Sequence, residues 1–165
     1  MTSLEEQGII SPVQFSSWAT PVVPVVKKSG KVRLCGDYKL TINQASPTDT
    51  YPLPRVDELY ANLAGGKYFS KLDMSNAYLQ LPLDEESKKY VMINTHKGLF
   101  QYNRLPFGVS FAPANFQRYI DSLLQGLQGT SAYLDDILVT GATSEEHLQN
   151  LDRVLGTSFS QLDSG

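Results

Sequence analysis

The sequence predicts an α+β domain, because its strands form hairpins and its helices follow without a regular strand–helix alternation. One predicted hairpin joins residues 22–26 to 31–37, and a second joins 90–94 to 99–103. The clearest helix lies over 116–127, where apolar residues recur at i, i+3, i+4, i+7, i+8 and i+11. These observations favour an α+β fold over repeated strand–helix–strand units.

Local turn and capping signals bound the remaining predicted elements: a short helix over 4–8, a loop over 41–54, a helix from Pro54 to Gly65-Gly66, strands over 68–72 and 132–139, and a helix from Thr143 to Leu155. Residues 156–165 lose the helical period and are polar, so they predict a disordered tail.

The composition indicates a globular protein. Of 165 residues, 41% are hydrophobic and 19% are charged, which suits one domain with its own core. No apolar run approaches the roughly 20 residues needed to cross a bilayer, and no signal peptide is visible. We therefore expect an intracellular protein with no membrane partner. The single Cys35 excludes an internal disulfide and a cysteine-rich zinc site.

The charges are unevenly distributed. The net charge of −3 is unusual for a nucleic-acid-binding protein, yet five basic residues fall between Lys27 and Lys39. Acidic residues gather instead at 84–86, 135–136 and 145–146. A basic flap beside an acidic metal-holding centre would give this pattern, and ordinary solvated surface charge is the alternative.

Three aspartates are the candidate metal ligands. Asp135 and Asp136 interrupt an apolar segment, and Asp73 directly follows the apolar strand 68–72. Burying unpaired carboxylates is costly, and a hard cation such as Mg²⁺ would compensate for them. If the two strands lie side by side, the three carboxylates converge and could hold two Mg²⁺ ions. The alternative is ordinary turn chemistry, since aspartate is common in turns.

Several motifs in order resemble those of reverse transcriptases. Tyr133-Leu134-Asp135-Asp136 resembles the YxDD box of that family, and three further segments resemble its fingers motif and its first and second palm motifs: 31–38, 69–78, and 105–109 with 112–117. The likeness is greatest to polymerases of Ty3/gypsy-type LTR retrotransposons and retrovirus-like pol polyproteins, and it runs from about Leu4 to Leu155. It implies a right-hand polymerase with fingers over 1–66 and 79–110 and an antiparallel palm sheet, packed on helices, over 67–78 and 111–155.

The resemblance also implies roles for individual residues. Asp73, Asp135 and Asp136 are expected to be catalytic and, with the backbone of Met74, to ligate two Mg²⁺ ions, for which Mn²⁺ could substitute. The expected deoxynucleoside triphosphate contacts are Lys28, Arg33, Tyr78 and Phe107, and the expected contacts to an RNA or DNA template with its primer are Gly108, Gln117 and Tyr133. Residue by residue, the alternatives are a solvated turn lysine for Lys28, a core aromatic for Tyr78 and an exposed helix glutamine for Gln117.

Two departures from the family pattern stand out. Gly36 occupies a fingers-strand position that is usually apolar, and a glycine there is expected to weaken the strand. After Leu155 the likeness ends, so a chain truncated before the thumb, connection and ribonuclease H regions is expected. The predicted function is an incomplete RNA-directed DNA polymerase, a nucleotidyltransferase. An inactive nucleic-acid-binding remnant is the alternative, whereas a nuclease lacks support because His96 and His147 are expected in a turn and on a polar helix face.

Overall fold

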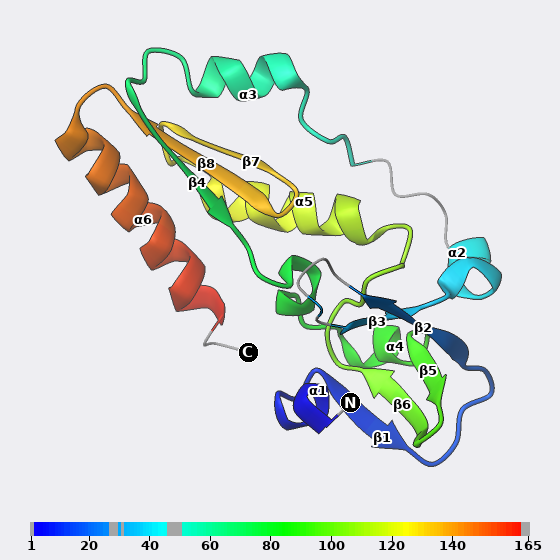
Figure 1. Cartoon of the computed structure of the whole chain (residues 1–165). Coiled ribbons are helices and arrows are strands. Elements are labelled where there is room, and N and C mark those ends of the chain that lie inside the picture. The colour runs from blue at the N-terminus through cyan, green and yellow to red at the C-terminus, as the bar shows by residue number, and fades with distance from the viewer. Residues whose placement is uncertain (1, 27–29, 31, 46–50, 163–165) are drawn as a thin grey trace. The chain divides into compact units, whose positions relative to one another are not determined.

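Two units make up the chain, and each is described by itself (Figure 1). The first comprises residues 1–49 and 78–112, and the second comprises 50–77 and 113–165. The computed structural model describes residues 2–26, 30, 32–45 and 51–162. In the second unit, α3 (Val56–Asn62) contacts β7 (Thr130–Tyr133). The expected fingers–palm division stays a prediction.

The first unit is built on a five-stranded sheet in the order β1-β6-β5-β2-β3. Its helices and strands are α1 (Thr2–Glu6), β1 (Ile10–Val13), β2 (Thr20–Val26), β3 (Val32–Gly36), η1 (Tyr38–Leu40), α2 (Ile42–Ala45), α4 (Glu85–Lys88), β5 (Met92–Thr95) and β6 (Gly98–Tyr102), with η2 (Ala77–Gln80) at the chain boundary between the units. Both predicted hairpins, β2–β3 and β5–β6, are confirmed, and β2 pairs in parallel with β5 at Thr20 and Ile93.

The loop predicted over 41–54 is partly wrong, because residues 42–45 form the short helix α2. Ile42 enters the core of the first unit, and Asn43 bonds to the backbone of a distant loop. A polar sequence can form such a helical turn when tertiary contacts hold it, and propensity alone does not report those contacts.

Gly36 is required by the packing of the first unit, and the expectation that it only weakens the strand is therefore wrong. A Cβ atom at this position would lie 2.5 Å from Cε2 and Cζ of Tyr38. The Tyr38 side chain is buried in the core, so the glycine makes room for its ring.

The second unit carries the three-stranded antiparallel sheet β4-β8-β7 (Figure 1). Its elements are α3, β4 (Tyr68–Asp73), α5 (Ala112–Leu124), β7, β8 (Asp136–Gly141) and α6 (Ser144–Leu162). Along α5, Phe116, Ile120 and Leu124 are buried, as the apolar period predicts. Helix α3 begins at Val56, two residues after the predicted Pro54, because Arg55 is its N-cap residue.

Helix α6 packs on the sheet through β4 and β8. Half of its predicted capping box is present, since Thr143 Oγ1 accepts the Glu146 backbone N–H at 3.2 Å. The Glu146 side chain accepts the Ala142 N–H at 2.8 Å in place of the Thr143 N–H. His147 does not lie on a polar face: it is buried, and its Nε2 lies 2.9 Å from Oγ of Ser70. The structure also differs at the end of the chain, since α6 continues to Leu162 where a disordered tail was expected from residue 156. Within the described residues, no helix is both long and apolar enough to cross a membrane.

Candidate active site

The sheet of the second unit brings Asp73 and Asp136 together. Strands β4 and β8 pair antiparallel, with Asp73 directly opposite Asp136. Residues directly opposite in such a pair have Cα atoms about 4.5–5.5 Å apart and side chains on the same face. The predicted adjacency of these two strands is therefore confirmed, and both carboxylates lie on one face at one end of the sheet.

Asp135 lies in the tight turn that joins β7 to β8. Tyr133 pairs with Asp136, so Leu134 and Asp135 form a two-residue hairpin loop. Leu134 has φ of 53°, a left-handed conformation that costs a bulky residue about 1–2 kcal/mol. The backbone N–H of Met74 donates to the carbonyl oxygen of Asp135 at 2.8 Å. The turn is thereby tied to the end of β4, immediately after Asp73.

Lys71 supplies a positive charge to this cluster. Its Nζ lies 2.8 Å from Oδ2 of Asp136, and the two side chains are 60% and 39% exposed. The hydrogen bond to Asp136, followed by the negative charges of Asp136, Asp73 and Asp135, raises the pKa of Lys71. Lys71 lies two residues before Asp73 on the same face of β4. Its ammonium group is therefore attracted by the same carboxylates that would attract a metal ion.

The chemistry of these donors suits a hard divalent cation. Carboxylate oxygens are the ligands that Mg²⁺ prefers, and the Lys71 ammonium already occupies a cation position beside Asp136. Among the described residues, no group of three or more His, Cys, Asp or Glu side chains is arranged as a metal site. The backbone thus brings the carboxylates to one place, and their side chains would have to turn inward to share an ion.

Gln117 supports the turn from behind and does not face solvent. Its side chain is fully buried, and its Oε1 accepts the Leu134 N–H at 2.7 Å. Its Nε2 donates to the Ala132 carbonyl oxygen at 3.0 Å. The alternative of an exposed helix glutamine is therefore wrong, because the amide is bonded to the hairpin, whereas a template contact stays a prediction. A polar residue within the buried stripe of α5 was the sequence signal for this role.

Three of the four expected triphosphate contacts meet in the first unit. The Arg33 guanidinium carbon lies 4.1 Å from the ring centroid of Phe107, a cation–π distance. The Phe107 and Tyr78 rings lie 5.1 Å apart at 46°. Tyr78 is half-buried and also packs against the core. Lys28, the fourth, lies outside the described residues.

Sequence reasoning missed Asn43, which holds the loop that carries Phe107 and Gly108. Its Nδ2 donates to the Gly108 carbonyl oxygen at 2.9 Å, and its Oδ1 accepts the Ser110 N–H at 2.8 Å. No sequence signal distinguishes it from other polar residues of its segment. Gly108 has φ of 100°, and a Cβ atom there would lie 2.7 Å from the Gly36 carbonyl oxygen. A glycine is thus needed for packing, whether or not a template contacts it.

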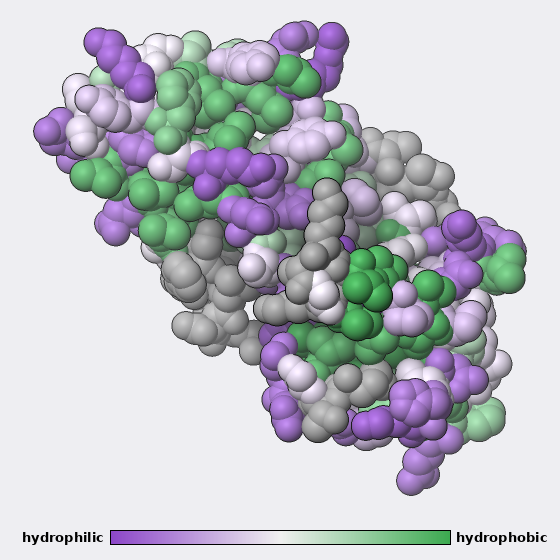
Figure 2. Space-filling view, viewed as in Figure 1, coloured by the Kyte–Doolittle hydropathy of each residue, from purple (hydrophilic) through white to green (hydrophobic). Residues whose placement is uncertain are grey.

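The surface around the carboxylates is open. Tyr133, directly opposite Asp136, is 42% exposed. Figure 2 shows apolar and hydrophilic side chains interleaved over α3 and the sheet of the second unit. Tyr60 and Phe69 are exposed there, and with Lys71 and Leu138 they line one hollow of this surface.

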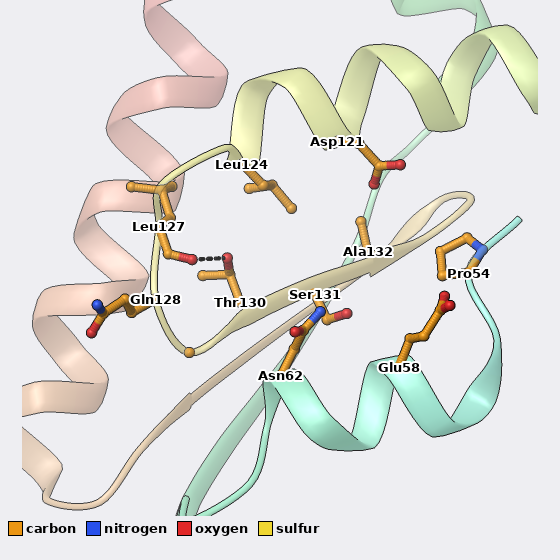
Figure 3. A pocket seen from close by; sticks show the side chains of 11 residues that line it. Pro54, Glu58, Asn62, Asp121, Leu124, Leu127, Gln128, Thr130, Ser131 and Ala132 are labelled. Atoms are coloured by element: carbon orange, nitrogen blue, oxygen red, sulfur yellow. Dashed lines mark hydrogen bonds between the residues drawn. The ribbon is translucent and has the colours of Figure 1, made fainter. Parts of the chain in front are cut away.

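A cavity of about 530 Å³ lies between α3, the end of α5 and β7 (Figure 3). Asp121, Leu124 and Ala132 line it together with Glu58 and Asn62 of α3. Its importance for the candidate site lies in Asp121, which hydrogen-bonds to Gln117.

Comparisons with known proteins agree with this arrangement. The family described as "Reverse transcriptase (RNA-dependent DNA polymerase)" matches residues 25–159. An uncharacterized protein of Caenorhabditis elegans is 42% identical over 149 residues, covering 89% of this chain and 12% of that protein. The retrovirus-related Pol polyprotein from transposon 412 of Drosophila melanogaster is 36% identical over 161 residues, covering 93% of this chain and 13% of that protein.

A solved structure of the foamy viral protease-reverse transcriptase in complex with an RNA/DNA hybrid superposes with a TM-score of 0.84 at 29% identity. The match covers 96% of this chain and 21% of that chain. The chain thus spans a small part of the proteins that it matches. Since the family match extends over most of its residues and the fold agrees, the chain belongs to the reverse transcriptase (RNA-dependent DNA polymerase) family.

Proposed function

We propose that this chain carries out template-directed deoxynucleotidyl transfer as the fingers and palm of an RNA-directed DNA polymerase of the Ty3/gypsy type. The observation that carries the proposal is the register of β4 and β8, which sets Asp73 opposite Asp136 on one face, with Asp135 in the adjoining turn. Three carboxylates at one sheet end can neutralise divalent cations that a triphosphate brings.

In this proposal Asp73 and Asp135 are the main ligands of two Mg²⁺ ions, and Asp136 supports them. When bound, these ions would activate the primer 3′-hydroxyl and stabilise the leaving pyrophosphate. The Met74 N–H is engaged by Asp135, so its carbonyl oxygen is the backbone group offered to the metal. Lys71 would have to leave Asp136 before that carboxylate could turn towards an ion.

The first unit supplies the contacts to the incoming nucleotide. Arg33 presents a planar fork of donors that can grip phosphate oxygens in pairs, and the Phe107 ring beneath it limits its freedom. Tyr78 packs between Phe107 and the core, and its ring is the group proposed to exclude a ribose 2′-hydroxyl. A deoxynucleotide preference is expected from this ring.

The proposed partners are an RNA or DNA template and its primer. The foamy viral enzyme that this chain resembles was solved with an RNA/DNA hybrid, which supports a duplex partner here. The exposed Tyr133 ring beside Asp136 offers an aromatic surface to the primer end. Gly108, exposed in its loop, offers backbone to the template.

Primer extension tests the proposal directly. The 165-residue chain would be incubated with oligo(dT) annealed to poly(rA), dTTP and Mg²⁺. We expect the primer to be elongated by the native chain. Asp135→Asn should abolish extension, because it removes a metal-binding charge. Asp152→Asn, on the exposed side of α6, should leave extension unchanged.

Binding of the same primer–template, measured by fluorescence anisotropy, separates the alternatives. Extension by both the native chain and Asp135→Asn would mean that a contaminant is responsible. Binding without extension by the native chain would overturn the proposal and support an inactive nucleic-acid-binding remnant.

A further inference from the structure

A chain of hydrogen bonds runs from the segment before α3 to the turn that carries Asp135. The Tyr51 hydroxyl donates to Oδ2 of Asp121 at 2.7 Å. Asp121 accepts from Gln117 Nε2 on its other oxygen at 2.9 Å, one turn away on α5. Gln117 in turn bonds to β7 at Ala132 and to the adjoining turn at Leu134.

The partners of the Gln117 amide allow only one orientation. Its nitrogen faces two acceptors, the Ala132 carbonyl oxygen and the Asp121 carboxylate, while its oxygen faces a donor, the Leu134 N–H. Reversing the amide would set oxygen against two acceptors and nitrogen against a donor, which would lose all three bonds. Asp121 therefore acts on the turn by fixing which end of Gln117 points to Leu134.

Asp121 is half-buried at the edge of a cavity. Its carboxylate lines the cavity between α3, α5 and β7 (Figure 3), whereas the Gln117 side chain is fully buried. Asp121 Oδ2 accepts the Tyr51 hydroxyl at 2.7 Å. The same bond to Asp121 raises the pKa of Tyr51, so the phenol remains protonated and donates.

The turn needs such support, because Leu134 is held in the left-handed region at φ of 53°. A strained backbone persists only where its surroundings over-determine it. The Leu134 N–H is fixed by Gln117, and the carbonyl oxygen of the next residue, Asp135, is fixed by Met74. These two bonds restrain the backbone on both sides of the Asp135 Cα and therefore the position from which its side chain starts.

We propose that Tyr51, Asp121 and Gln117 form one positioning network that holds the Leu134–Asp135 turn and thereby fixes the Asp135 carboxylate. None of the three touches the reacting groups. The part of this proposal that concerns metal binding by Asp135 rests on the proposed function. The part that concerns the conformation of the turn does not.

Amide hydrogen exchange, followed by NMR, tests the holding of the turn without nucleotide or metal. The Leu134 amide should be protected in the native chain. In Gln117→Met, which keeps the size of the side chain but not its hydrogen bonds, this amide should exchange about tenfold faster. Val154, buried in α6, should exchange at the native rate. Gln149→Met, on the exposed face of α6, is the matched control and should change neither amide.

Tyr51→Phe keeps the test decisive if Gln117→Met fails to fold, because it removes a single hydroxyl at a half-buried site. We expect a rise of about two- to threefold in Leu134 exchange, since only the outermost bond of the network is lost. An unprotected Leu134 amide in the native chain, or one unaffected by both variants, would overturn the network.

Mn²⁺ binding, measured by electron paramagnetic resonance, tests the consequence for Asp135. Gln117→Met should bind Mn²⁺ more weakly than the native chain, and Gln149→Met should match it. Faster Leu134 exchange with unchanged Mn²⁺ affinity would overturn the assignment of Gln117 as a positioning residue. A native chain that protects Leu134 but binds no Mn²⁺ would instead refute the proposed function and leave the network supported.

Discussion

Gly36→Ala provides the sharpest test of the packing in the first unit. The new methyl carbon would lie 2.5 Å from Cε2 and Cζ of Tyr38. Carbon atoms in contact are normally about 3.5–4.0 Å apart, so the ring would have to move by about 1 Å. It has little room to do so, because Tyr38 is 1% exposed and lies in the core of the first unit.

The cost follows from two opposing effects. Overpacking a filled core typically costs about 1–3 kcal/mol, while replacing a strand glycine by alanine recovers about 0.5–1 kcal/mol of backbone entropy. We therefore expect Gly36→Ala to lower the free energy of unfolding by about 1–2 kcal/mol. In a Tyr38→Leu background the clash is absent, so the same substitution should be neutral or slightly stabilising.

Urea unfolding measures this double-mutant cycle. Trp18 is the single tryptophan and lies in the first unit, so its fluorescence reports on that unit. Coupling of at least about 1 kcal/mol between the two positions is expected, as for residues in contact. Equal destabilisation by Gly36→Ala with and without the Tyr38 ring would refute the packing argument.

Three further outcomes are expected. Lys71→Met should raise Mn²⁺ affinity severalfold in a resonance titration, because it removes a positive charge that competes for Asp136, and weaker binding would contradict this reasoning. Tyr38→Phe should leave the free energy of unfolding in urea unchanged or raise it by up to about 1–3 kcal/mol, because the buried hydroxyl has no hydrogen-bond partner among the described residues. A clear loss of stability would show that the hydroxyl does have a partner. The Asp84 carboxylate accepts the Ser87 N–H at the start of α4, and this hydrogen bond lowers the pKa of Asp84. The bond therefore stabilises the folded chain above the pKa that Asp84 has when unfolded, and this stabilisation is lost as the pH falls through the lower pKa of the folded chain. Protection of the Ser87 amide should accordingly fall below about pH 4 in the native chain and not in Asp84→Asn, and equal pH profiles would exclude this cause.

Much of the second unit could be predicted from its sequence, because hydrophobic periodicity is a local signal. The buried stripe of α5 and the strand that leads into Asp73 both follow from alternation or helical spacing. The pairing of Asp73 with Asp136 required one further assumption, that the two strands are neighbours, and the register confirms it.

Features that depend on distant contacts could not be predicted in the same way. Asn43 stabilises a loop more than sixty residues away in the chain, and nothing in its own segment indicates this. Strand propensity predicts only that Gly36 weakens β3, whereas the space taken by the Tyr38 ring decides its role. The resemblance implies a template contact for Gln117, with an exposed helix glutamine as the alternative, and neither interpretation reports that its side chain is buried against the hairpin.

The register of β8 shows how ordinary packing fixes the candidate site. Ile137 and Val139 are buried on one face of the strand, while Asp136 and Leu138 lie on the other. A shift of one residue would exchange the two faces, exposing two apolar side chains that each contribute about 1.5–3 kcal/mol and burying a carboxylate. The alternation that builds the core therefore also holds Asp136 opposite Asp73. The candidate site needs only two further features of the sequence. These are the carboxylates of Asp73 and Asp136 at the ends of their strands, and a turn that is held firmly enough to position the Asp135 carboxylate.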